Sequence, residues 1–330
     1  FIFLTWVLLA VGLLGVVAFF TLLERKVLAA LQHRKGPDVA GLFGILQPIA
    51  DGAKLIKKQN ITPTSSNSLI FKISPILVFC LALTTWSVVS LDYEAQIVSL
   101  DFDLLFILAI SSLGVYGIIL GGWSSNSKYA FLGALRSTGQ MLSYEIALGL
   151  SILPVVLITG SFRLSEIIAF QAVVFLPLLL MIFPSFIVFL ISMLVETNRH
   201  PFDLPEAEAE LVAGYNVEYG AFSFALFFLA EYASMILMSV LITLLFAGGW
   251  DTMISLINCE NQCTFFFMKV SLIYYFFVLV RGFLPRTRPD QLMSFGWKVL
   301  LPFAFGFLVY IIGFLFYYDF APIINIFINS

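Results

Sequence analysis

Two carboxylates stand inside long apolar runs of this sequence. Glu145 lies in the run 139–160, and Glu231 lies in the run 220–247. An ionised acid at the centre of a membrane-spanning helix costs about 2.5–3.5 kcal/mol, so each needs an interior or wet location. A carboxylate in such a place can take up and release protons, and we expect both to be functional. Glu24 ends the first apolar run, where an acid can instead reach the lipid headgroups.

A short segment between two apolar runs is strongly acidic, and Arg199 is its one cation. Its acids are Glu196, Asp203, Glu206, Glu208, Glu210 and Glu218. On a helix that begins near Pro205, Asp203, Glu206 and Glu210 share one face. A capping box formed by Asp203 and Glu206 explains part of the pattern, but not all of these acids. Acids stacked in a low dielectric repel each other, so some should have raised pKa values and relay protons.

The composition of the chain indicates that lipid surrounds most of it. Of its 330 residues, 61% are hydrophobic and 11% are charged, and the mean hydropathy is +1.02. A soluble domain could not bury so much apolar surface. A bilayer span needs about 20 mostly apolar residues. Eight runs qualify, at 2–23, 70–91, 104–122, 139–160, 170–195, 220–247, 265–284 and 299–320.

These runs predict an all-α integral membrane protein, because barrel strands are shorter and alternate in polarity. We expect one polytopic domain over residues 1–330 with about eight transmembrane helices. The first run is followed, not preceded, by its charges, which predicts a retained helix and not a cleaved signal peptide.

The basic residues predict how the runs are oriented. Of the 17 Lys and Arg residues, only Arg163 and Lys269 lie away from the loops that follow the first, third, fifth and seventh runs. Basic loops stay on the cytoplasmic side or its organellar equivalent. We therefore expect these odd-numbered loops on one side of the bilayer and both termini on the other.

The loop after the first run contains an amphipathic stretch. Leu46, Ile49, Ala53 and Ile56 form an apolar stripe, while Asp51, Lys54 and Lys58 fall on another face. This pattern is typical of a helix that lies in the membrane interface. By itself it leaves open whether the helix only binds headgroups or also lines a ligand path.

Cysteine and histidine form no metal or iron–sulfur pattern. His33 and His200 stand alone in loops, and we predict structural roles for both. Cys80 lies in a span, whereas Cys259 and Cys263 share an outer loop and either pair or stay free. There is no Gly-rich phosphate loop. We expect no redox cofactor, no metal site and no nucleic-acid partner.

The segment Glu196–Glu210, which reads ETNRHPFDLPEAEAE, resembles the signature of subunit 1 of respiratory complex I, the membrane subunit that forms the quinone chamber. Other blocks follow in the same order along the chain. They are Glu24-Arg25-Lys26, Gln32-x-Arg34-x-Gly36-Pro37, Gln47-Pro48-x-x-Asp51-x-x-Lys54-Leu55, Gly121-Gly122-Trp123-x-Ser125-Asn126 running on to Gly133-Ala134-Leu135-Arg136, Ser143-Tyr144-Glu145 and Arg281-x-x-x-Pro285-Arg286-x-Arg288-x-Asp290-Gln291-Leu292. An acid that commonly follows Lys58 in the family is replaced by Gln59-Asn60, so no role for it is carried over.

The resemblance implies a subunit of proton-translocating NADH:ubiquinone oxidoreductase, with ubiquinone as substrate and no redox centre in this chain. It implies contacts with the hydrophilic-arm subunits at the quinone site, with small membrane subunits and with lipid. The residues implied for the quinone tunnel and chamber are Glu24, Arg25, Arg34, Asp51, Arg199, Phe202 and Asp203. Those implied for a proton relay are Tyr144, Glu145, Glu196, Glu206, Glu208, Glu210 and Glu231.

The implied location is the mitochondrial inner membrane, or the plasma membrane if the source is bacterial. The odd loops and the interfacial helix would face the matrix, and the termini the intermembrane space. Three alternatives remain. A related subunit of a membrane-bound hydrogenase would not use quinone. An independent cation or proton transporter would show an internal repeat with interrupted helices, which we do not find. A pure scaffold would not need the acidic segment.

Overall fold

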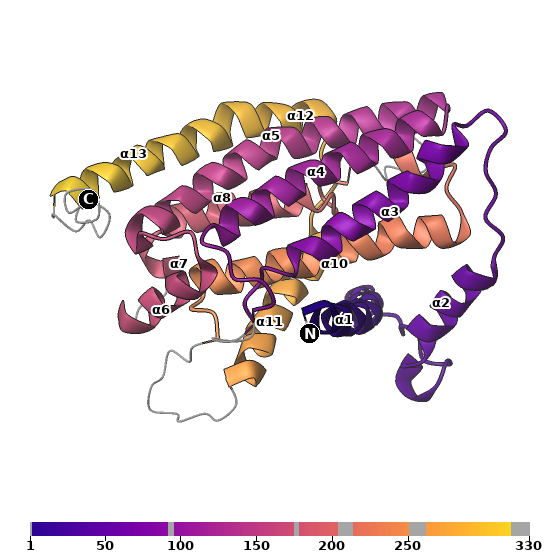
Figure 1. Cartoon of the computed structure of the whole chain (residues 1–330), viewed down its shortest axis with the longest axis horizontal. Coiled ribbons are helices and arrows are strands. Elements are labelled where there is room, and N and C mark those ends of the chain that lie inside the picture. The colour runs from indigo at the N-terminus through magenta and orange to yellow at the C-terminus, as the bar shows by residue number, and fades with distance from the viewer. Residues whose placement is uncertain (1, 92–95, 175–177, 204–213, 251–261, 318–330) are drawn as a thin grey trace.

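The computed structural model describes residues 2–91, 96–174, 178–203, 214–250 and 262–317 (Figure 1). Within these ranges the chain is helical and contains no strand. The elements in the first half are α1 (Ile2–Leu31), η1 (Leu42–Gly44), α2 (Gln47–Lys57), α3 (Ser68–Thr85), α4 (Asp103–Ser124) and α5 (Lys128–Thr159). Those in the second half are α6 (Leu164–Val174), α7 (Leu178–Met181), α8 (Phe183–Glu196), η2 (Gly214–Asn216), α10 (Ala221–Phe246), α11 (Gln262–Phe283), α12 (Pro289–Phe295), the π-helical turn η3 (Gly296–Leu300) and α13 (Leu301–Tyr317).

Seven helical stretches among the described residues are long and apolar enough to cross a membrane. The all-α membrane class is thereby confirmed. The continuous span predicted over 170–195 is corrected, because its described residues belong to three shorter helices, α6, α7 and α8. Pro184 lies in the first turn of α8, a position where its missing amide hydrogen is tolerated. The 14 residues of α8 reach about 21 Å, less than the roughly 30 Å hydrocarbon core.

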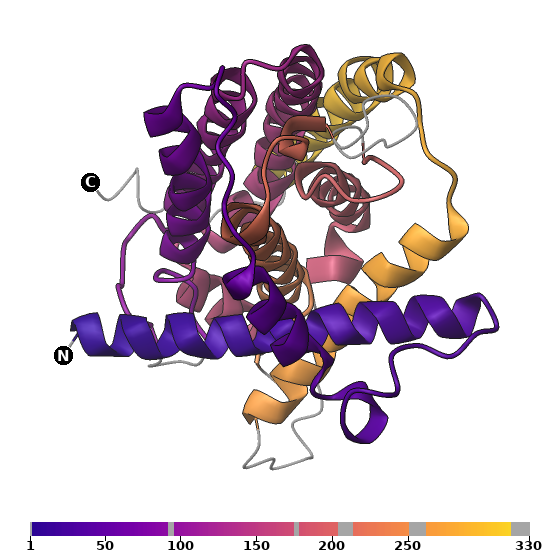
Figure 2. The same cartoon turned by 90° about the vertical axis from the view of Figure 1, so that its right-hand side faces the viewer.

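Helix α10 forms the centre of the bundle, and most of its side chains are buried. It packs against α3, α11 and α1, and its second half supplies much of the main hydrophobic core. Helices α3, α4 and α5 run side by side along the bundle, whereas α1 lies across it (Figures 1 and 2). Small residues allow the close approach of neighbours, as where Gly122 on α4 meets Ala134 on α5.

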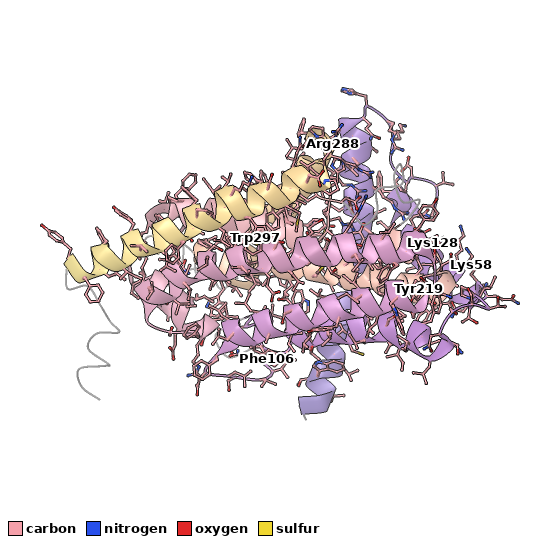
Figure 3. All side chains as sticks on the ribbon, turned by 90° about the horizontal axis from the view of Figure 1, so that it is seen from above. Lys58, Phe106, Lys128, Tyr219, Arg288 and Trp297 are labelled. Carbon is pink, nitrogen blue, oxygen red and sulfur yellow. The ribbon has the colours of Figure 1, made fainter. Side chains whose placement is uncertain are left out.

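The odd-numbered loops meet at one end of the bundle, as the basic residues predict. The Asn67 amide donates to the Ser124 carbonyl at 3.0 Å, and the Phe222 amide donates to Asn60 Oδ1 at 3.1 Å. The Thr287 amide donates to the Pro201 carbonyl at 3.2 Å. Figure 3 shows Lys58, Lys128 and Tyr219 gathered at this end.

Polar side chains hold the helices together at the opposite end. Asp103 is fully buried and accepts hydrogen bonds from the Leu100 and Leu164 amides at 3.3 and 3.1 Å. Gln171 on α6 donates to the Leu244 carbonyl of α10, and Lys269 on α11 donates to carbonyls just beyond the end of α10. These contacts fix the last turn of α10.

Candidate functional site

The carboxylate of Glu24 lies at the centre of a buried ionic cluster. It is 4% exposed and accepts hydrogen bonds from Arg281 on α11 and from the Tyr232 hydroxyl on α10. Arg199, in the turn after α8, brings Nη1 within 3.7 Å of Glu24 Oε1. The sequence left open whether Glu24 points to headgroups or inward. The structure places it inward, because two guanidinium groups compensate the cost of burying its charge.

Arg199 also contacts the second carboxylate of the cluster. Its Nε lies 2.8 Å from Glu231 Oε1, and its guanidinium lies 4.4 Å from the centre of the Tyr232 ring. Arg199 therefore joins Glu24, implied for the quinone tunnel, to Glu231, implied for the proton relay. Two arginines and two glutamates balance each other, so the cluster is formally neutral when all four are charged. We name Glu24, Arg199, Glu231 and Arg281 the ionic cluster.

Glu231 faces a cavity as well as Arg199. This cavity has a volume of about 110 Å³ and is lined by residues of α3, α4, α5 and α10 and by the end of α8. Glu196 contributes to the same lining, and its Oε2 has no hydrogen-bond partner within the described part of the chain. The cavity is lined mostly by apolar side chains, and Glu196 and Glu231 bring carboxylates into it. Two of the acids predicted for the relay thus line one cavity.

Two further relay residues lie on α5. Glu145 is half-buried and lies close enough to Glu196 for their negative charges to repel each other. Tyr144 is fully buried, and its hydroxyl donates to the Leu292 carbonyl at 2.8 Å. Its proton is therefore held by the backbone, not by a carboxylate.

The turn that carries Phe202 and Asp203 is fastened to α5. Gln140 donates through Nε2 to the Val195 carbonyl at 2.9 Å and to the Phe202 carbonyl at 2.8 Å. Asp203 is buried, with Arg286 Nη2 at 3.5 Å from its Oδ2. Of the remaining acids of this segment, Glu218 is half-buried, whereas Glu206, Glu208 and Glu210 lie outside the described residues. So do Cys259 and the side chain of Cys263, and the pairing of these cysteines stays a prediction.

The other tunnel candidates lie farther out, where α2 packs against α1. Arg25 Nη1 is 2.7 Å from Asp51 Oδ2, and Gln47 donates to Asp51 Oδ1 at 3.0 Å. Helix α2 leaves Ile49 and Ile56 exposed, as an interfacial helix should. Arg34 is exposed and bonds Gln32, so the structure does not bring it to the ionic cluster.

His200 follows Arg199 in the turn and is half-buried. Burial, together with the positive charges of Arg286 and Arg281, lowers the pKa of the imidazole. Its Nδ1 has no hydrogen-bond partner among the residues that the structure describes. Nothing in this geometry departs from the structural role predicted for it.

Sequence reasoning missed Arg281 and Tyr232 as site residues. Arg281 ends an apolar run in a basic loop, where a surface role is the ordinary interpretation. A buried Glu24 requires a cation, and that requirement is the one signal that could have identified a partner. The identity of that partner depends on how α1 and α11 cross.

The chain is similar to membrane subunits of NADH–quinone oxidoreductases along nearly its whole length. A family profile described as NADH dehydrogenase matches residues 4–312. NADH-ubiquinone oxidoreductase chain 1 of Triticum aestivum is 55% identical over 303 residues, covering 91% of this chain and 92% of the relative. The same-named chain of Chondrus crispus is 52% identical over 312 residues, covering 94% and 95%. A subunit of the NADH-quinone oxidoreductase of Rhodospirillum rubrum is 51% identical over 315 residues, covering 94% and 92%.

These matches confirm the resemblance that the motifs carried. With several apolar helices in the structure, they also confirm a multi-pass membrane protein of the respiratory chain. The chain belongs to the NADH dehydrogenase family, the family of the chain 1 membrane subunit of NADH–quinone oxidoreductase.

Proposed function

We propose that this chain forms part of the path by which ubiquinone reaches its reduction site, and that it couples this reduction to proton translocation. The supporting observation is that Arg199 contacts both Glu24 and Glu231 while Glu231 shares a cavity with Glu196. A change of charge beside Arg199 would therefore be felt by Glu231 and, through the shared cavity, by Glu196. A scaffold would not require this link.

Reduction of a quinone to a quinol consumes two electrons and two protons. Negative charge that appears on the quinone head attracts a guanidinium, and Arg199 then binds its carboxylates less strongly. A carboxylate that loses its cation in a low dielectric gains affinity for a proton. Glu231 would take up that proton, Glu196 lines the same cavity, and Glu145 lies near Glu196. The acids of residues 206–210 would extend the same relay.

The outer group of tunnel residues would act at the entrance. Asp51 and Arg25 join α2 to α1 beside the exposed apolar face of α2, where lipid and an isoprenoid tail have the same chemistry. Phe202 would contribute an apolar wall near the chamber. The quinone is substrate here, and the chain supplies no redox centre.

The end of the bundle that gathers the odd-numbered loops would face the hydrophilic arm. We place that end in the mitochondrial matrix, or in the cytoplasm of a bacterium, because basic loops face inward. Other subunits of the oxidoreductase, including quinone-site subunits and small membrane subunits, are the proposed partners. Lipid would cover the exposed apolar faces of α1 and α13.

The test replaces Glu231 or Glu196 by glutamine in the assembled oxidoreductase. Both variants should lose most quinone reductase activity and proton translocation, while NADH oxidation by a soluble acceptor that bypasses quinone stays normal. Glu166→Gln is the matched control, because Glu166 is exposed at the opposite end and pairs with Arg163 at 3.4 Å. Normal turnover and normal proton uptake in both variants would overturn the relay.

A further inference from the structure

The end of the acidic segment carries a tyrosine whose hydroxyl is buried between two other helices. Tyr219 lies just before α10 and is 6% exposed. Its hydroxyl oxygen is 2.9 Å from Ser74 Oγ on α3 and 3.3 Å from Ser124 Oγ on α4. It also lies 3.3 Å from the Gly121 carbonyl oxygen, to which it can donate. The hydroxyl of one loop residue is thus held by α3 and α4 together.

The ring of Tyr219 packs against two other aromatic rings. It stacks on Phe71 with ring centres 4.1 Å apart, and it meets the ring of Phe227 edge-on at 5.0 Å. Phe227 in turn contacts Tyr215 at 5.4 Å. Tyr215 and Phe227 both line the cavity that Glu196 and Glu231 share. The ring therefore supports the wall of that cavity from behind.

The backbone before Tyr219 lies directly on α5. A Cβ added to Gly133 would come within 2.8 Å of the backbone of Gly214 and Tyr215, so only glycine allows this approach. The Tyr219 amide donates to the Asn216 carbonyl at 3.0 Å, which closes the turn. Residues 214–219 therefore contact α3, α4 and α5.

We propose that Tyr219 is a positioning residue, whose hydroxyl fastens the end of the acidic segment to α3 and α4 and so fixes the cavity wall beside Glu196 and Glu231. This inference rests on the proposed function, in which those acids carry protons. Tyr219 itself does not relay them. Burial raises the pKa of its phenol, which keeps it a neutral hydrogen-bonding group.

The test is Tyr219→Phe in the assembled oxidoreductase, because it removes the hydroxyl and keeps both ring contacts. Hydrogen exchange at the amides of Val217 and Tyr219 should become about fivefold faster, the factor that corresponds to one lost hydrogen bond. Proton translocation per NADH oxidised should fall, and the pH profile of quinone reduction should shift. Rates are normalised to NADH oxidation by a soluble acceptor. Tyr116→Phe is the control, since Tyr116 on α4 is exposed.

An unchanged rate of amide hydrogen exchange at residues 217 and 219 in Tyr219→Phe would overturn the proposal. Faster exchange with an unaltered pH profile and an unaltered proton yield would also overturn it, because the hydroxyl would then be merely structural. Should Tyr219→Phe fail to accumulate, Ser124→Ala removes one partner and keeps the tyrosine, and it is judged by the same two readouts. Glu231→Gln tests the proposed function separately. If Glu231→Gln is defective and Tyr219→Phe is not, the proposed proton relay is supported and only the positioning role of Tyr219 is overturned.

Discussion

Replacing Arg199 by methionine should destabilise the bundle more than any surface ion pair could. Removing one partner of a buried pair costs about 3–5 kcal/mol, because the other charge stays buried. Glu24 would keep Arg281 and Tyr232, whereas Glu231 would lose the guanidinium that lies 2.8 Å from its carboxylate. The glutamate side chain is 14% exposed, so we expect the lower end of the range, about 3 kcal/mol.

A second substitution separates a lost charge balance from lost packing. In Arg199→Met/Glu231→Gln the carboxylate that lost its cation is also removed, and the cost should fall by roughly half. Arg163→Met is the control, because Arg163 pairs with exposed acids and should cost less than about 1 kcal/mol. The assay is the midpoint of thermal unfolding of the purified oxidoreductase, read by scanning calorimetry and not by quinone reductase activity, which the glutamate substitution would itself remove. A double variant that is no more stable than Arg199→Met would refute the charge argument.

Two further outcomes follow from the geometry. Gly133→Ala should lower the thermal midpoint by an amount that corresponds to about 1–3 kcal/mol, because its Cβ meets backbone that must shift. Gly149→Ala on the same helix meets nothing within 4 Å and should be neutral or slightly stabilising, so equal effects at the two sites would contradict this reasoning. His200 has a lowered pKa in the folded chain, so its contribution to stability is present above about pH 6.5 and lost as the pH falls through the folded value. His200→Gln should therefore flatten the loss of thermal stability between pH 7 and pH 5.

The helices themselves were predictable because hydropathy over about 20 residues reports them directly. Within the ranges that the structure describes, that reasoning failed at 170–195. An average over a window ignores where a proline stands, and Pro184 begins a new helix instead of continuing an old one. The helix after the first span was predicted, since α2 covers Gln47–Lys57 and exposes Ile49, and its place in the membrane interface stays a prediction.

The functional groups were predictable one by one, but their pairing was not. An acid inside an apolar run must have an interior reason, which identified Glu145 and Glu231 from the sequence alone. Which cation each acid binds depends on helix crossings that no local pattern encodes. Arg199 and Arg281 reach Glu24 from distant parts of the chain. Tyr219 escaped notice because serine and tyrosine near the end of a span carry no signal until their contacts are known.

The crosswise position of α1 also bears on how far the helices tilt in a membrane. Helix α1 and helix α5 are both long and apolar enough to cross a membrane, yet they do not run in the same direction (Figure 2). Their 30 and 32 residues extend about 45 and 48 Å, half as long again as the roughly 30 Å of hydrocarbon. This surplus length is what a steeply inclined helix needs. If both helices cross the bilayer, its normal lies between the two helix axes, and both helices are tilted.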